Sequence, residues 1–295
     1  MSIFVDRETR VVVQGVSPTS QGLYHALRNR AYGTAVVAGT NPRRGGEVIE
    51  GIPVYATVRE AVAETGANAS FIAVPPAGAP GAILEAAEAG IPFVVCITEF
   101  IPAKDEALVF ATLRRRYPGT RLLGPNCPGV ISPGQANIGI TPSDIALGGG
   151  PVGLVSRSGT VFYQALYDLT QHGVGQTTGV GIGGDPVPGT GFIDVLAAFE
   201  ADEETRAVLL IGEIGGSEEE RAARFIAEQM TKPVVAYIAG VTAPEGRKMG
   251  HAGAIVSGSH GTARAKMEAL AAAGVEVAQN PTEAAERMVE VVSKL

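Results

Sequence analysis

Short apolar runs alternate with stretches of helical periodicity along the chain, and this alternation restricts the fold more than any other feature. Such alternation is typical of parallel sheets with crossover helices. Thr57 and Glu60 have the spacing of a capping box, which predicts a helix start. We therefore expect a Rossmann-like α/β domain over residues 1–125. Its strands are expected at 11–13, 34–38, 70–74, 93–97 and 121–123.

The same pattern restarts after residues 124–150, a segment rich in Gly, Pro, Asn and Ser that we interpret as a connection with little regular structure. Ser217 and Glu220 again have capping-box spacing. The sequence thus predicts a second, flavodoxin-like parallel-sheet domain over 126–295, and 295 residues suffice for two domains. Its strands are expected at 152–155, 177–182, 207–211, 233–238 and 275–277.

Composition excludes several classes of function. The net charge of −7 and the lack of a long basic block disfavour nucleic acid as a partner. Two cysteines are too few for a disulfide framework, and the four histidines lack metal-ligand spacing, so no metal site is predicted. With no apolar run of 18 residues and no signal-peptide pattern, we expect a cytoplasmic protein without a membrane partner.

Four loops of the second half follow strands of the predicted sheet. Ligands of open parallel sheets bind beyond the carboxyl ends of the strands, so we expect the loops to meet there. Ser158, Gly159 and Thr160 open a helix directly after a strand, which forms a cradle for a phosphate. Taken alone, an ordinary helix cap explains these three residues equally well. The loops are 156–160, 183–186, 212–216 and the segment that bears His251.

His251 lies in the sequence Gly-His-Ala-Gly, shortly after Arg247 and Lys248. Small neighbours let a bulky partner approach the ring, and nearby cations favour an anion beside it. An imidazole on such a loop, preceded by Gly246 and Gly250, can act as a nucleophile and carry a phosphoryl group between two places. An isolated histidine of this kind is more often a solvated loop residue, and only the other loops favour the functional interpretation.

A carboxylate near His251 would fix the tautomer of the ring. Glu213 lies one residue past a buried strand and could accept a hydrogen bond from one imidazole nitrogen. Asp185 could do the same, or it could cap a turn. We favour Glu213.

The loop 15–22 stands at the first strand-to-helix turn, where dinucleotide folds bind pyrophosphate. It lacks the Gly-x-Gly-x-x-Gly pattern, and no ribose-binding acid follows the second strand. Arg43 and Arg44 stand there instead, which favours a phosphorylated adenine ligand such as coenzyme A over NAD; a solvated basic turn is the alternative. The chain has no P-loop and no Gly-x-Ser-x-Gly, and Cys127 fits a small buried residue better than a catalytic thiol.

These motifs closely resemble the alpha subunit family of succinyl-CoA synthetases (succinate–CoA ligases), from Ile3 to the C-terminus. The family implies a coenzyme A-binding first domain, a phosphohistidine second domain and a place in the tricarboxylic acid cycle. It also implies a beta subunit with the ATP or GTP and Mg site, in a heterodimer or heterotetramer, and a small dicarboxylate substrate. The matching motifs lie at 124–129, 156–160, 181–186, 211–216, 232–235 and 239–255.

The resemblance assigns a role to each matching residue. His251 corresponds to the phosphorylated residue and Glu213 to its carboxylate partner, and Tyr163 to a tyrosine near the carboxylate substrate. The family residues that hold the phosphoryl group correspond to Ser158, Gly159 and Thr160. Residues that correspond to coenzyme A contacts are Ser17, Pro18, Thr19, Ser20, Gln21, Arg44, Ile97, Thr98 and Glu99.

Three departures from the family pattern fall in the first domain. The first loop is one residue longer and contains Pro18, which removes a backbone donor. Arg44 replaces a lysine, and Phe100 replaces a glycine. This pattern suggests a divergent paralogue. A ligase for malate or another dicarboxylate, and a non-catalytic coenzyme A-binding regulatory subunit, therefore stay open beside succinate–CoA ligase.

Overall fold

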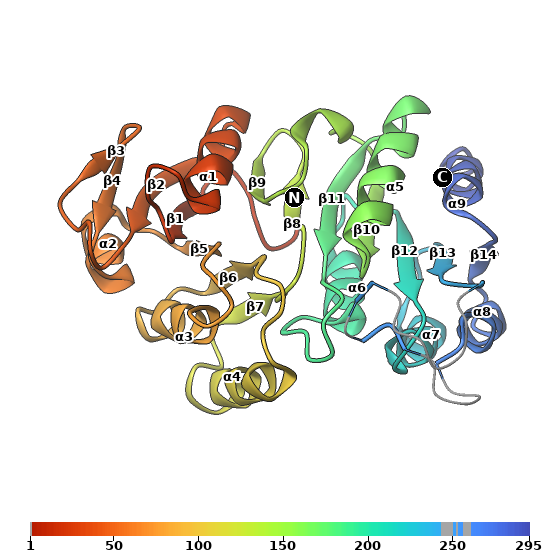
Figure 1. Cartoon of the computed structure of the whole chain (residues 1–295). Helices are drawn as coiled ribbons and strands as arrows, with labels where there is room; N and C mark the ends of the chain where they lie inside the picture. The colour runs from red at the N-terminus through yellow and green to blue at the C-terminus, as the bar shows by residue number, and fades with distance from the viewer. Residues whose placement is uncertain (1, 243–249, 252, 256–260) are drawn as a thin grey trace. The chain divides into compact units, whose positions relative to one another are not determined.

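The computed structural model describes residues 2–242, 250–251, 253–255 and 261–295 (Figure 1). Two compact units are present. The N-terminal unit comprises Phe4–Thr141 and Val187–Gly189, and the C-terminal unit comprises the remaining described residues. The domain division that we predicted after residue 125 stays a prediction.

The N-terminal unit contains a seven-stranded sheet of the order β3-β4-β2-β1-β5-β6-β7, parallel except for the β3–β4 hairpin. The strand order changes direction at β1, so the crevice beyond β1 and β5 is where such a sheet binds ligands. The elements are β1 (Arg10–Gln14), α1 (Gln21–Tyr32), β2 (Ala35–Thr40), β3 (Val48–Ile49), β4 (Ile52–Tyr55), α2 (Val58–Thr65), β5 (Ala69–Ile72), α3 (Ala79–Glu88), β6 (Phe93–Cys96), α4 (Ala103–Arg116) and β7 (Arg121–Leu123).

Apolar strands and helix caps explain this architecture. Val12, Ile72 and Val94 of the central strands are fully buried. Helix α2 packs on α3, and α3 on α4, whereas α1 packs on β1 and β2 (Figure 1). Thr57 caps α2, because its side chain accepts a hydrogen bond from the Glu60 N–H, as predicted.

The segment 124–150 contains regular structure, so our interpretation of it as an irregular connection was wrong. Strands β8 (Gly129–Ser132) and β9 (Ala136–Gly139) pair as an antiparallel hairpin, and η1 (Ser143–Ile145) is a short 3-10 helix. The apolar runs are only one or two residues long, which hid the strands. The Thr34 hydroxyl donates to the Asn137 carbonyl and accepts from the Asn137 N–H, both at 2.9 Å, and this ties the hairpin to its unit.

The C-terminal unit contains five parallel strands in the order β14-β13-β12-β10-β11. Here the strand order changes direction at β10, so loops after β10 and β12 flank the crevice. The α/β class with two largely parallel sheets is therefore confirmed. The elements are β10 (Val152–Ser156), α5 (Gly159–Gln171), β11 (Gln176–Gly181), α6 (Phe192–Ala201), β12 (Ala207–Glu213), α7 (Glu218–Gln229), β13 (Val234–Ala239), α8 (Ala263–Ala272), β14 (Glu276–Ala278) and α9 (Pro281–Val292).

Helices cover the strands of this unit in two groups. Helix α5 packs on α9, while α7 packs on both α6 and α8 (Figure 1). The predicted capping box at Ser217 was wrong, because this side chain makes no capping hydrogen bond to α7. The acidic side chains of Glu218, Glu219 and Glu220 in the first turn stabilise the start of α7 through the helix dipole.

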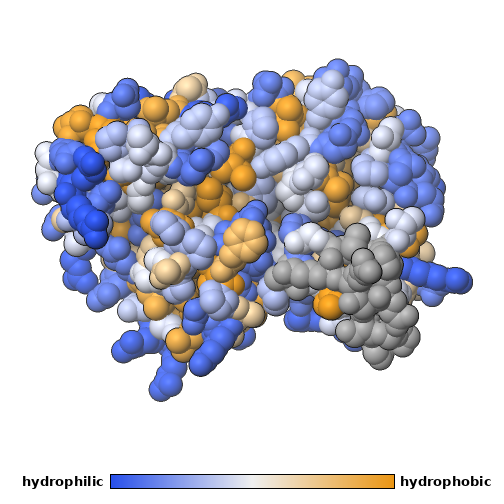
Figure 2. Space-filling view, viewed as in Figure 1, coloured by the Kyte–Doolittle hydropathy of each residue, from blue (hydrophilic) through white to orange (hydrophobic). Residues whose placement is uncertain are grey.

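The surface that Figure 2 shows is mostly hydrophilic, with apolar residues scattered over it. Within the described residues, every helix is too short or too polar to cross a bilayer.

Candidate functional site

The imidazole of His251 is bound to the carboxylate of Glu213. Glu213 is the last residue of β12, and its Oε2 lies 2.7 Å from Nδ1 of His251. The Glu213 side chain is only 7% exposed, whereas the His251 side chain is 25% exposed. The acid is therefore shielded from solvent while the ring stays accessible. The structure thus brings together the two residues that the sequence paired.

Arg157 and Asp185 complete a charged cluster around this pair. Arg157 follows β10 directly and is buried, and its Nε lies 3.4 Å from Oε1 of Glu213. Its guanidinium also donates to the Asp185 carbonyl at 3.4 Å. The buried arginine neutralises the Glu213 carboxylate and ties the loop after β10 to the loop after β11.

Glycines allow the loops to approach the imidazole. A Cβ on Gly184 would lie only 2.1 Å from Cγ of His251, so only glycine leaves room for the ring there. The Gly253 N–H donates to the Gly184 carbonyl at 3.4 Å. A Cβ on Gly215 would lie 2.0 Å from the Gly253 carbonyl oxygen. The four loops that we expected at this edge of the sheet do meet there.

The pKa of His251 is raised above its ordinary value. The main cause is the hydrogen bond to Glu213, and the charges of Glu213 and Asp185 act in the same direction. Burial and the positive charge of Arg157 lower the pKa of His251 and partly offset this rise. Glu213 thus stabilises positive charge on the ring and, by accepting the hydrogen bond, favours the proton on Nδ1, which leaves the lone pair of the neutral ring on Nε2.

The start of α5 has the geometry of a helix cap at the same edge. The Ser158 hydroxyl accepts from the Val161 N–H at 3.3 Å, and the Ser156 hydroxyl donates to the Ser158 carbonyl at 2.7 Å. Thr160 is exposed and Gly159 half-buried, so the first turn is accessible to an anion. Tyr163 is half-buried one turn further along α5. The roles of these residues in binding stay predictions.

In the N-terminal unit, a cavity of about 460 Å³ opens at the start of α1. Ser20 caps this helix, because its hydroxyl accepts from the N–H groups of Ser17 at 2.9 Å and Leu23 at 3.1 Å. A helix start with accessible N–H groups is a position where a phosphate can bind. The lining of the cavity includes the predicted residues Pro18, Thr19, Ser20 and Gln21, together with Leu23, Tyr24, Leu27 and Glu50.

Arg44 lies on the loop after β2, where its guanidinium forms an ion pair with Glu47 at 3.0 Å. The pair is partly exposed, so Arg44 can exchange this partner for a phosphate at little cost.

The loop after β6 presents the other residues predicted to contact coenzyme A. Thr98 is buried, and its hydroxyl donates to the Val74 carbonyl at 2.8 Å, which anchors the loop. Ile97 is half-buried and Glu99 is exposed, so these two side chains are accessible. Phe100 has a φ of +65° and is 82% exposed.

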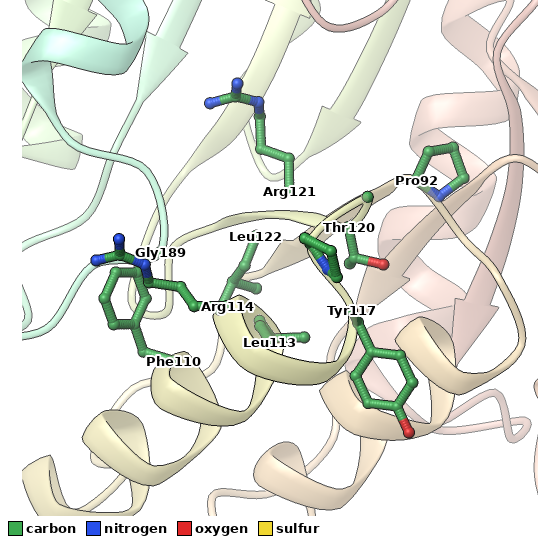
Figure 3. A pocket seen from close by; sticks show the side chains of 11 residues that line it. Pro92, Phe110, Leu113, Arg114, Tyr117, Thr120, Arg121, Leu122 and Gly189 are labelled. Atoms are coloured by element: carbon green, nitrogen blue, oxygen red, sulfur yellow. The ribbon is translucent and has the colours of Figure 1, made fainter.

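A separate cavity of about 550 Å³ lies beside the end of α4 (Figure 3). Arg114 lies over the Phe110 ring at 5.7 Å, and Arg121 lines the same cavity. The charged residues of the lining are Arg114 and Arg121, and the hydroxyl-bearing residues Tyr117 and Thr120 also line the cavity.

Sequence reasoning missed three charged residues near His251. Arg157 stood in the motif Ser-Arg-Ser-Gly-Thr that we had singled out, and its position directly after a buried strand was an available signal. Glu219 and Lys266 lie on helices with many other charged residues, and only the structure shows that they are fully buried. Arg247 and Lys248, the cations predicted beside the ring, and Gly246 lie outside the described residues.

Comparison with known families defines the class of protein. Residues 6–100 match the model of the CoA binding domain, and residues 155–276 match the model described as CoA-ligase. The two matches fall on the parallel strands and crevices of the two units. The chain therefore combines a coenzyme A-binding region with a CoA-ligase region.

Curated relatives narrow this class. The chain is 54% identical to the succinate–CoA ligase [ADP-forming] subunit alpha of Aquifex aeolicus, over 99% of this chain and 95% of the relative. It is 53% identical to the same subunit of Staphylococcus epidermidis, over 100% and 96%. The chain belongs to the family of succinate–CoA ligase alpha subunits. These relatives do not favour the other dicarboxylate–CoA ligases or the regulatory subunit.

Solved structures share the fold. An ATP citrate lyase from Methanothrix soehngenii, in complex with citrate and coenzyme A, matches with a TM-score of 0.89 and 26% identity over 99% of this chain. An acetyl-coenzyme A synthetase from Ca. Korarchaeum cryptofilum matches with a TM-score of 0.76 and 23% identity over 97%. The chain spans only 51% and 61% of those two proteins, so their whole activities do not transfer to it.

Proposed function

We propose that the chain is the phosphoryl-carrying alpha subunit of a ligase that forms succinyl-CoA from succinate, coenzyme A and ATP. The observation that carries this proposal is the 2.7 Å contact between Nδ1 of His251 and the buried Glu213 carboxylate. This hydrogen bond leaves Nε2, the other nitrogen of an accessible imidazole, free to attack phosphorus. ATP and succinate are taken from the names of the ADP-forming relatives.

Glu213 prepares His251 for the first step. Its carboxylate accepts the hydrogen bond from Nδ1–H, so the lone pair of Nε2 is free to attack the γ-phosphorus of ATP. The P–O bond to ADP breaks as the N–P bond forms. The carboxylate then stabilises the positive charge that develops on the ring.

The phosphoryl group then moves to the acid. A succinate oxygen attacks phosphorus, the N–P bond breaks, and succinyl phosphate results. The coenzyme A thiol attacks the succinyl carbonyl, the C–O bond to the phosphate group breaks, and the thiol proton leaves with the phosphate. The start of α5 at Ser158, Gly159 and Thr160 binds the phosphoryl oxygens, and Tyr163 lies near the succinate carboxylate. The buried charge of Arg157 stabilises the added negative charge.

Coenzyme A binds to the N-terminal unit in this proposal. Its phosphates meet the start of α1 at Ser17–Gln21 and Arg44, and Ile97, Thr98 and Glu99 border the rest of the molecule. The supporting observations are the match to the CoA binding domain and the cavity at the helix start.

A beta subunit supplies the nucleotide site with its Mg ion, in a heterodimer or heterotetramer. The support is that the relatives are named as subunits alpha. The proposal includes a cytoplasmic location and a place in the tricarboxylic acid cycle.

The test is reconstitution with the beta subunit from the same source, with succinyl-CoA formation measured for succinate, malate and other dicarboxylates. We expect succinate to have the highest kcat/KM and His251→Asn to be inactive, while a half-buried control on α4, Thr112→Ala, keeps the parent rate. Succinyl-CoA formation by His251→Asn, or an inactive parent complex, would contradict the proposal.

A further inference from the structure

A fully buried ion pair lies beneath the loop that bears Glu213. Lys266 of α8 and Glu219 of α7 contact each other through Nζ and Oε2, and both side chains are 0% exposed. Ions of this kind lose their hydration, and a pair that only joined two helices would add little stability compared with an apolar pair. The contacts around the pair therefore need a further explanation.

Both backbone groups of Glu213 bind this ion pair. Glu219 accepts the N–H of Glu213 through Oε1 at 3.0 Å. Lys266 donates to the Glu213 carbonyl at 2.9 Å and also to the Gly215 carbonyl. The three N–H donors of the ammonium group are thus all used, two of them on the loop. The pair binds the backbone from which the Glu213 side chain projects.

Gly212 shows that the carboxylate of Glu219 is fitted closely against the loop. A Cβ on Gly212 would lie 2.6 Å from Cγ of Glu219 and 2.8 Å from its Oε1. The residue before Glu213 must therefore lack a side chain for this contact to form. Burial raises the pKa of Glu219, and the charges of Lys266 and Arg157 oppose this rise.

We infer that Glu219 and Lys266 are positioning residues that hold Glu213 within hydrogen-bonding distance of His251. The importance of this for catalysis rests on the proposed function, but the positioning itself does not. Without Lys266, the loop 213–215 loses two carbonyl contacts, and without Glu219 the Glu213 N–H loses its acceptor. The carboxylate then moves relative to the imidazole, although neither Glu219 nor Lys266 touches the ring.

The test compares Lys266→Met and Glu219→Gln with a matched control, Leu270→Ala. Leu270 lies one turn further along α8 and is fully buried, so its truncation destabilises the fold without removing a contact to the loop. The imidazole pKa of His251 is measured by NMR in each folded protein, with the signal assigned from His251→Asn. The rate of phosphorylation is measured in the reconstituted complex.

We expect the pKa of His251 to fall towards 6.5 in Lys266→Met, and to fall less in Glu219→Gln, which keeps an oxygen for the Glu213 N–H. The kcat should fall on the order of tenfold to a hundredfold with an unchanged KM for succinate. Leu270→Ala should keep the parent pKa and kcat. If Lys266→Met does not fold, the double variant Glu219→Gln with Lys266→Met removes both buried charges and should show the same fall.

The inference would be overturned if folded Lys266→Met and Glu219→Gln kept the parent values of the His251 pKa and kcat. An equal fall of the pKa and kcat in Leu270→Ala would also overturn it. The NMR titration needs no beta subunit or nucleotide. A parent chain that is never phosphorylated would therefore refute the proposed function and leave the test of positioning intact.

Discussion

At the scale of single residues, Glu213 is the group that controls His251. Its carboxylate is shielded from solvent, so its hydrogen bond to the imidazole acts in surroundings of low dielectric constant. Arg157 limits this effect by neutralising part of the negative charge. The balance keeps a raised pKa on a ring that is still accessible to a phosphoryl donor.

Replacing Glu213 by Gln should lower the pKa of His251, because the negative charge of Glu213 disappears and the hydrogen bond from the ring then goes to a neutral amide. A folded-state pKa above the unfolded value of 6.5 stabilises the protein fully below pH 6.5, and this contribution disappears as pH rises through the folded pKa. As pH rises from 6.5 to above the folded-state pKa of His251, the free energy of unfolding should therefore fall more in the parent than in Glu213→Gln. Urea unfolding at a series of pH values checks this, and parallel pH profiles would contradict it.

Phe100 provides a second prediction at this scale. A φ of +65° costs a residue with a Cβ about 1 kcal/mol relative to glycine, and the exposed ring buries little surface that could offset this cost. Phe100→Gly should therefore be more stable than Phe100→Ala by about 1 kcal/mol. Urea midpoints of the two variants measure the difference. Equal midpoints would show that the loop relaxes around any side chain.

Sequence reasoning found His251 and Glu213 because both are conspicuous in small-residue loops after apolar strands. It could not find Glu219 or Lys266, because the burial of a charged residue on a helix depends on which neighbouring helix packs against it. Arg157 could have been identified from the sequence, since it directly follows a buried strand.

At the scale of elements, short loops after parallel strands bring the charged groups together. The strand order of the C-terminal unit changes direction at β10, so the loops after β10 and β12 meet. Most strands could be predicted because a strand buried on both faces is a continuous apolar run. The β8–β9 hairpin could not, because its strands are held by backbone pairing and by Thr34 rather than by a long apolar run.

Gly184 tests the fit between the loop after β11 and the imidazole. Gly184→Ala should displace His251, because the new Cβ would lie 2.1 Å from the ring, and it should lower the pKa of His251 while the sheet stays folded. The control is Gly81→Ala in α3, where a Cβ meets nothing within 4 Å and should stabilise the helix by about 0.5–1 kcal/mol. NMR titration and circular dichroism give the two readouts, and an unchanged pKa in Gly184→Ala would contradict the fit.

At the scale of the whole molecule, the two units divide the chemistry: one matches the CoA binding domain and the other contains the histidine cluster. We expect calorimetry to show one coenzyme A bound per chain. Arg44→Ala should weaken binding about tenfold or more, the contribution of one charge-assisted hydrogen bond, whereas the exposed neighbour Arg43→Ala should bind almost as the parent does. An equal loss in both variants would point to general electrostatic attraction instead of a contact by Arg44.

The central claim is that His251 carries the phosphoryl group, and mapping the phosphorylated residue tests it most directly. The chain is incubated with its beta subunit and ATP labelled with ³²P in the γ position, digested at alkaline pH and analysed by mass spectrometry. We predict acid-labile label on His251 alone, absent from His251→Asn and released when succinate and coenzyme A are added. Label on any other residue, or label that persists in His251→Asn, would contradict the account.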